Sequence, residues 1–210
     1  MNRAPLIGIS RLRMGTDGHG VTTLVAFHGC PLRCKYCLNP QSLTDDVKVM
    51  VKTPEEVMQA IRKDELYYLA TNGGVTFGGG EPLLRAEFIK ELLELGAKQW
   101  HITIETSLNV PLQNLVLLFP YIHEYVVDIK DMNPCIYKAY NGRDNELVKS
   151  NLRWLIEQGK AENITCRIPL IPEFNTSEDQ QSSKQELEAM GITRFDFFKY
   201  RTNINNQYDR

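Results

Sequence analysis

The chain has 210 residues, 42% of them hydrophobic, and a formal net charge of −2. This length predicts one domain spanning residues 1–210, and the near-neutral charge gives no electrostatic reason to expect a nucleic acid or an anionic membrane as a partner. Residues 1–15 lack the apolar core of a secretory signal, and no apolar run approaches the roughly 20 residues that a membrane-spanning helix needs. The five cysteines are an odd number with three close together, which favours the cytoplasm over a secreted disulfide scaffold.

Hydrophobic patterns and turn residues predict alternating strands and helices along the chain. Strands are expected at 21–28, 73–78, 101–106, 125–130, 164–170 and 195–200. Helices are expected from residue 53 onward and at 85–95, 112–118, 145–158 and 183–190. The first helix has the clearest start, because Thr53 and Glu56 can form a capping box around Pro54. The expected buried faces are Phe88, Leu92 and Leu95 in the second helix and Leu147, Leu152 and Leu155 in the fourth.

The order of these elements favours an α/β fold with a parallel sheet and helices outside it. About six strand-helix steps are expected, whereas a closed eight-fold barrel typically needs about 250 residues. The sequence therefore predicts a partial, laterally open (β/α)6 TIM-like barrel. About 20 residues at the N-terminus are expected to form a frayed extension to it.

Three cysteines, Cys30, Cys34 and Cys37, follow the first predicted strand in a C-x3-C-x2-C pattern within residues 29–40. Buried apolar cysteines are one interpretation, but charged and polar residues interleave them. A structural zinc site would need a fourth ligand, for which His28 is a candidate. Three thiolates on a [4Fe–4S] cluster, which normally takes four, leave one iron free for a substrate.

The two other cysteines, Cys135 and Cys166, are isolated in the sequence. Each is expected to be a buried small side chain.

The cysteine pattern, with Tyr36 before the last cysteine, resembles the signature of the radical S-adenosylmethionine enzymes. The resemblance implies a [4Fe–4S] cluster on the three cysteines and S-adenosylmethionine chelated to the open iron. It further implies that reductive cleavage of S-adenosylmethionine gives a 5′-deoxyadenosyl radical, which removes a hydrogen atom from a substrate.

Four further strand ends strengthen the resemblance and suggest cofactor contacts. The residues that it implies as contacts are Tyr36, Leu38, Gly79, Gly80, Glu81, Glu105, Thr106, Asp128, Lys130 and Arg167. Gly79, Gly80 and Glu81 match a G-G-E segment that receives the amino group of S-adenosylmethionine. The resemblance also implies a monovalent cation near Glu105 and Asp128.

The D-x-K pattern of Asp128 and Lys130, and the run from Arg167 to Asn175, resemble the activating enzymes of glycyl radical enzymes, nearest to the pyruvate formate-lyase activating type. The chain lacks the extra cysteines of an inserted ferredoxin-like part. It carries Leu38 where relatives often have histidine. Near its C-terminus it offers Lys199 and Tyr200 where they often have another histidine.

The resemblance implies an activase that abstracts the α-hydrogen of a glycine in a partner glycyl radical enzyme. An open-sided barrel suits such a partner, because a loop of a large protein must enter it. A flavodoxin or ferredoxin is expected as the electron donor. The alternatives are a radical enzyme acting on a small molecule or a peptide, the activase of an anaerobic ribonucleotide reductase, and a non-catalytic metal-binding module.

Overall fold

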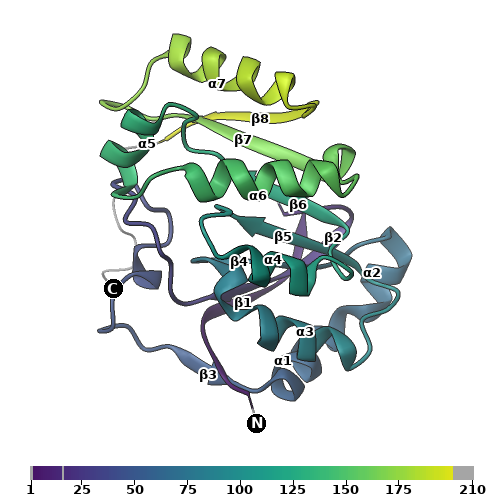
Figure 1. Ribbon diagram of the computed structural model, residues 1–210. Coiled ribbons are helices and arrows are strands. Elements are labelled where there is room, and N and C mark those ends of the chain that lie inside the picture. Colours follow the sequence, from purple (N-terminus) through teal and green to yellow (C-terminus); the bar gives the residue numbers. More distant parts are fainter. Residues whose placement is uncertain (1, 16, 201–210) are drawn as a thin grey trace.

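The computed structural model describes residues 2–15 and 17–200 (Figure 1). The strands are β1 (Ala4–Met14), β2 (Val21–Phe27), β3 (Met50–Lys52), β4 (Gly74–Gly79), β5 (His101–Thr106), β6 (Glu124–Asp128), β7 (Ile164–Leu170) and β8 (Arg194–Lys199). The helices are α1 (Pro54–Ile61), α2 (Glu65–Thr71), α3 (Ala86–Glu94), α4 (Leu112–Leu118), α5 (Pro134–Asn141), α6 (Glu146–Glu157) and α7 (Ser177–Ala189). Short 3₁₀ turns connect several of them.

The strands form one sheet of eight in the order β3-β1-β2-β4-β5-β6-β7-β8. The six strands from β2 to β8 in this order are parallel to their neighbours, and their carboxyl ends lie side by side. Within residues 2–15 and 17–200, the two edges of the sheet do not pair with each other. The prediction of six parallel strands in a laterally open α/β barrel is confirmed.

The N-terminus differs from its prediction. It is not frayed over residues 2–15, because β1 pairs antiparallel with β2 and, through its first residues, with β3. Ala4 and Leu6 are fully buried in the main core, which ties this strand to the sheet. The alternation is hard to read in the sequence, since basic residues interrupt it and Leu12 has a left-handed backbone at φ +54°.

The helices pack on one side of the sheet, and the expected capping box at the start of α1 is present. Two predicted core residues are wrong, because Leu95 follows the end of α3 and Leu147 lies on the outer face of α6, and both are exposed. Ile89 and Val148 are buried on these helices instead. Helix α7 begins six residues earlier than predicted, at a capping box formed by Thr176 and Asp179.

The strands alternate between a helix-facing side and the barrel interior. Val75, Phe77, Ile102 and Ile104 join the helix-facing core. The other side carries polar groups, and Thr76 there donates a hydrogen bond to the carbonyl of Asp17 in the β1–β2 connection. None of the helices in the described part of the chain combines the length and the apolar composition of a membrane span.

Candidate active site

A pocket opens at the carboxyl ends of the parallel strands. The predicted site residues that line it are Cys30, Cys34, Cys37, Leu38, Gly79, Gly80, Glu105, Thr106, Asp128, Lys130 and Arg167. Tyr36 and Glu81 were predicted as well but do not line it. The pocket wall also contains Leu32, Ser42 and Ser107, which were not predicted from the sequence. Ser107 directly follows a predicted strand end, and this position is the signal that points to it.

Residues 29–40 carry the three cysteines and are here called the cysteine loop. Backbone hydrogen bonds fix this loop on two sides. The N–H of Glu81 donates to the carbonyl of Gly29 at 2.8 Å, and that of Gly29 donates to Ser42 at 3.0 Å. On the other side, the N–H groups of Arg33 and Lys35 donate to carbonyls at the end of α5. These hydrogen bonds therefore fix the position of the loop between the end of β4 and the end of α5.

All three loop cysteines are free thiols of intermediate exposure. Burial, and then the nearby Glu81 carboxylate, raise the pKa of Cys30 to about 12. Burial also raises the pKa of Cys34, while the charge of Lys130 opposes this change. Among the described residues no three side chains stand in a ready metal-binding arrangement, the cysteines included, so a metal would have to displace their protons and draw the thiolates together.

The two isolated cysteines and His28 do not line the pocket. Cys166 is buried as predicted, whereas Cys135 is exposed, because it lies in the first turn of α5 on its outer side. The Nε2 atom of His28 lies 2.9 Å from the carbonyl of Thr44, and His28 is not in the pocket wall. His28 is thus engaged outside the pocket, which disfavours the zinc interpretation.

The glycine turn after β4 crosses the cysteine loop closely. A Cβ atom on Gly80 would lie 2.2 Å from the carbonyl oxygen of Gly29, and one on Gly79 would lie 2.7 Å from the nitrogen of Phe27. Gly79 also has φ +95°, a conformation that side chains disfavour. Only glycine fits at these two positions, which leaves the backbone bare toward the pocket.

The carboxylate of Glu81 is turned away from the pocket and is buried. It accepts hydrogen bonds from the Thr106 hydroxyl at 2.7 Å, from the Ser107 hydroxyl at 2.7 Å and backbone at 2.9 Å, and from the Leu83 backbone at 3.2 Å. Burial raises the pKa of Glu81, and these donors oppose the rise. The carboxylate therefore clamps the end of β5 to the turn after β4.

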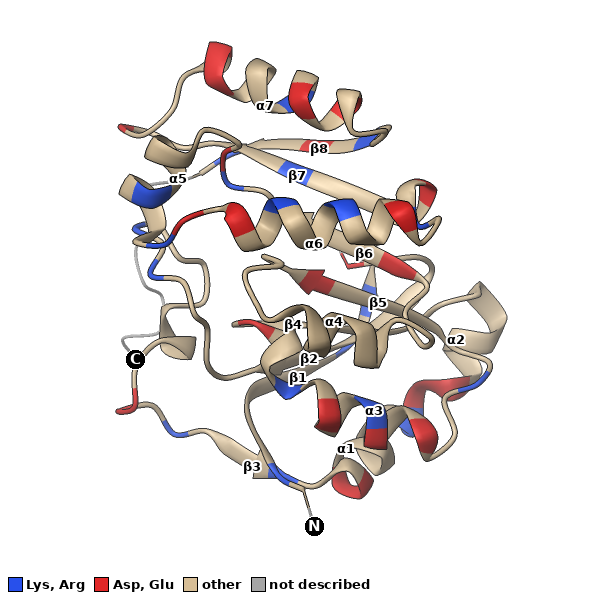
Figure 2. Cartoon of the chain, viewed as in Figure 1, with Lys and Arg blue, Asp and Glu red and all other residues tan. Residues whose placement is uncertain are grey.

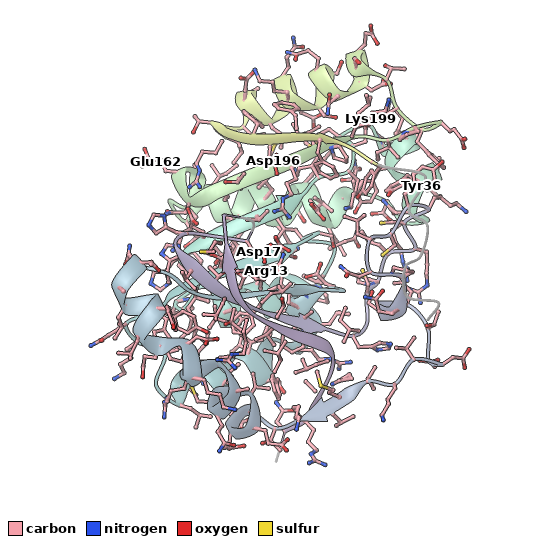
Figure 3. The ribbon with its side chains drawn as sticks, turned by 180° about the vertical axis from the view of Figure 1, so that it is seen from behind. Arg13, Asp17, Tyr36, Glu162, Asp196 and Lys199 are labelled. Carbon is pink, nitrogen blue, oxygen red and sulfur yellow. The ribbon has the colours of Figure 1, made fainter. Side chains whose placement is uncertain are left out.

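Arg167 and Lys130 each form an ion pair with a carboxylate on the pocket wall. Arg167 Nη1 donates to Glu105 at 2.9 Å, and its Nε donates to Asp196 at 3.2 Å (Figure 3 labels Asp196). Burial would lower the pKa of Arg167, but Glu105 and Asp128 raise it overall. Burial raises the pKa of Glu105, against the effect of Arg167.

The second pair is Lys130 with Asp128, whose atoms Nζ and Oδ2 are 2.9 Å apart. It is not a surface ion pair, because Lys130 is buried and also donates to the hydroxyl of Tyr200. Burial would lower the pKa of Lys130, but Asp128, Tyr200 and Cys34 hold it well above its ordinary value. An ammonium group is thus fixed inside the pocket.

Tyr36 belongs to an aromatic group beside the pocket. Its ring packs against Tyr140, Phe174 and Tyr200 at centroid distances of 6.1 to 6.4 Å, and its hydroxyl donates to Glu173. Figure 3 shows Tyr36 on the loop and Lys199 at the nearby end of β8. The aromatic group supports the cysteine loop from behind, and Lys199 is exposed while Tyr200 reaches the pocket.

Comparisons with known proteins find a family and relatives that cover most of this chain. The family model described as "Radical SAM superfamily" matches residues 24–182. The (2S)-3-sulfopropanediol dehydratase activating enzyme of Klebsiella oxytoca is 30% identical, with 83% of this chain and 74% of that protein covered. The pyruvate formate-lyase 2-activating enzyme of Escherichia coli is 27% identical, with 89% and 73% covered.

A solved structure shows the same fold. Streptococcus suis SuiB bound to S-adenosylmethionine superimposes with a TM-score of 0.65 at 19% sequence identity. The match covers 87% of this chain and 43% of that one, so this chain spans less than half of its length.

Proposed function

Because the chain belongs to the radical SAM superfamily and is an enzyme of that type, we propose that it activates a partner glycyl radical enzyme. It would do so by abstracting the α-hydrogen of a glycine in that partner. The relatives that cover most of both chains are activating enzymes, which supports this assignment within the superfamily. The proposal rests above all on three unpaired thiols that face one pocket together with a bare glycine turn and a buried ammonium.

The donor set fits a [4Fe–4S] cluster held by Cys30, Cys34 and Cys37. The three thiols face one pocket, and no further cysteine or histidine among the described residues lines it, so a bound cluster would keep one iron open. When bound, the cluster supplies an electron for the reductive cleavage of S-adenosylmethionine, which yields the radical that removes the hydrogen atom.

The pocket residues would bind and orient S-adenosylmethionine. The backbone at Gly79 and Gly80 faces the pocket without side chains. The Gly79 carbonyl accepts from Asn39 Nδ2 at 3.0 Å and keeps a second lone pair for the amino group of S-adenosylmethionine, while Lys130 offers an ammonium to its carboxylate. Thr106 and Leu38 lie in the same wall, Tyr36 supports the loop, and Glu81 contributes by fixing the end of β5.

The proposed monovalent cation would sit near Glu105 and Asp128. Arg167 and Lys130 already neutralise these two carboxylates. A cation would therefore bind in competition with both side chains.

The substrate would be a glycine-bearing loop that enters through the open side of the barrel. Glycine has no side chain to block the approach, and the interior can exclude water around the radical. We propose a cytoplasmic protein that works without oxygen and receives its electron from a flavodoxin or ferredoxin. Catalysis on a small molecule or a peptide is the alternative outcome of the test.

The test is anaerobic reconstitution with iron and sulfide, followed by reduction, addition of S-adenosylmethionine and quantification of 5′-deoxyadenosine. We expect cleavage by the native chain and none by Cys34→Ala, with Cys135→Ala as the matched control because Cys135 is exposed outside the pocket. A candidate partner should then develop a glycyl radical signal in electron paramagnetic resonance. A cluster that forms but never cleaves S-adenosylmethionine would contradict the proposal and indicate a binding module.

A further inference from the structure

Four cations surround the cysteine loop on its outer side. They are Arg33, Lys35, Lys138 and Arg143, here called the loop cation patch, and all four are exposed. Figure 2 shows blue segments on α5 and on the loops next to it, which together form this side of the molecule. The patch is notable because the whole chain carries a formal net charge of −2.

Backbone contacts bring the four cations together from two distant parts of the sequence. The N–H of Arg33 donates to Asn141 at 3.0 Å, and the N–H of Lys35 donates to Tyr140 at 3.2 Å. Lys138 lies in the last turn of α5, just before these acceptors. The loop and the end of α5 therefore present their cations on one continuous surface.

Two of the cations are anchored next to the thiols. Arg33 Nη1 donates to the carbonyl of Cys30 at 2.8 Å, and Arg143 Nε donates to the carbonyl of Pro31 at 3.3 Å. These contacts hold the guanidinium groups at the loop without neutralising them. The positive charge is thus fixed beside the residues that would hold the cluster.

Within residues 2–15 and 17–200, none of the four cations forms an ion pair. The acidic groups nearest in sequence or by contact are Asp144, next to Arg143, and Glu173, which accepts from Tyr36. The apolar side chain of Leu38, 59% exposed, lies on the same loop. Unpaired cations beside an exposed apolar contact are suited to a negatively charged protein surface.

We propose that the loop cation patch is the docking surface for an acidic one-electron carrier protein. This inference rests on the proposed function, because it assumes a cluster on the cysteines that must be reduced from outside. Transient electron-transfer complexes bury small interfaces, and opposite charges mainly speed their formation. The four cations of the loop cation patch provide such an attraction next to the cysteines that would hold the electron-accepting cluster.

The electron transfer is balanced with a flavodoxin as the donor. Its anionic flavin hydroquinone loses one electron and becomes the neutral semiquinone, while the cluster gains that electron. No proton moves in this step, and no other reactant is needed.

The experiment measures binding of a purified flavodoxin to the reconstituted protein at low ionic strength, by surface plasmon resonance. The test variant is Lys35→Glu with Lys138→Glu, because these side chains anchor no backbone carbonyl among the described residues. The control variant is Lys63→Glu with Lys98→Glu, two exposed lysines outside the loop and α5. A second readout is 5′-deoxyadenosine formation driven either by reduced flavodoxin or by photoreduced 5-deazariboflavin, a small uncharged reductant.

We expect the test variant to bind flavodoxin about tenfold more weakly than the native chain, because electrostatic steering is worth about 10-fold or more in association rate. The difference should disappear near 1 M salt, where the Debye length is only about 3 Å. Cleavage driven by flavodoxin should slow accordingly, and cleavage driven by deazariboflavin should not change.

Equal flavodoxin affinity of the native and test proteins would overturn the docking surface, as would an equal loss in the control variant. Slower glycyl radical formation with deazariboflavin as reductant would also overturn it, since the patch would then serve the protein substrate. Failure of the native chain to cleave S-adenosylmethionine with deazariboflavin would instead contradict the proposed function.

Discussion

The hydroxyl oxygen of Tyr200 lies 3.0 Å from Nζ of Lys130 and completes the buried polar environment of that ammonium group with Asp128. Lys130 has a left-handed backbone at φ +62°, so the chain turns sharply at the end of β6 to place it there. The contact joins the last described residue to the centre of the pocket.

The substitution Tyr200→Phe should weaken binding of S-adenosylmethionine, because Lys130 would lose one of its two partners. Loss of a hydrogen bond to a buried charge costs about 1.5–3 kcal/mol. We expect part of this cost to appear as a roughly tenfold weaker affinity for S-adenosylmethionine. Equilibrium dialysis with the reconstituted protein measures it. Tyr67→Phe is the control, since Tyr67 lies exposed on α2 and is not in the pocket wall. Equal affinities of all three proteins would exclude this role of Tyr200.

The substitution Gly80→Ala should prevent correct closure of the cysteine loop. Its new methyl group would meet the Gly29 carbonyl at 2.2 Å, and backbone on both sides leaves no easy relief. We expect destabilisation of about 1–3 kcal/mol, as for other overpacked sites, and iron incorporation well below four per chain. Gly8→Ala is the matched control, because nothing lies within 4 Å of its Cβ position. Full iron loading of the Gly80 variant would show that the loop can move aside.

The substitution Glu81→Gln separates a clamp from a direct cofactor contact. The carboxylate now accepts four hydrogen bonds, and the amide would place an N–H group against some of these donors. We therefore expect the free energy of unfolding to fall by about 2–3 kcal/mol. Urea denaturation of the protein without cofactors measures this loss. If stability is unchanged while affinity for S-adenosylmethionine falls, Glu81 contacts the cofactor directly and the clamp interpretation is wrong.

The pair of Asp64 and Arg11 should make stability depend on acid pH. Asp64 is buried, and both of its oxygens accept from Arg11, at 2.6 and 2.8 Å. The Arg11 hydrogen bonds lower the pKa of Asp64 below its ordinary value of 3.8. Since the folded pKa is the lower one, the stabilisation is fully present above about pH 4–5 and is lost as the pH falls through the folded pKa.

The substitution Asp64→Asn should remove that pH dependence and cost about 2 kcal/mol at pH 7, where Arg11 remains partly solvated. Unfolding free energies of both proteins at pH 7 and pH 3 check it, with the expectation that the difference narrows at pH 3. A constant difference across this range would contradict the assignment of the pH effect to Asp64.

Local signals in the sequence predicted several of the helix ends. The capping box at Thr53 and Glu56 and the glycines that follow α3 and α6 mark helix ends in a form that survives tertiary packing. The capping box of Thr176 has Asp179 in place of the usual Glu or Gln, so it is a weaker sequence signal, and the predicted start of α7 was too late. The N-terminal strand had no such signal, because its register shifts twice against β2.

The sequence predicts which residues belong to the candidate site more readily than it predicts the contacts between them. The cysteines and glycines follow from short patterns. The pairing of Arg167 with Glu105 joins residues 62 positions apart, and that of Lys130 with Tyr200 joins residues 70 positions apart, so only the assembled sheet defines them. The orientation of Glu81 away from the pocket likewise depends on the neighbouring strand end, which a sequence pattern does not contain.

The hydrogen bonds between Gly29 and Glu81, and between Phe27 and Gly80, connect the cysteine loop to the neighbouring strand through the backbone. We therefore expect the order of maturation to be fixed: β2 and β4 pair first, and iron and sulfide arrive at a polypeptide that is already folded. The metal centre would then be a late addition rather than a nucleus of folding. A cellular iron–sulfur carrier would have to recognise the finished surface of the loop, and chains awaiting their cluster would persist as a stable, inactive reserve.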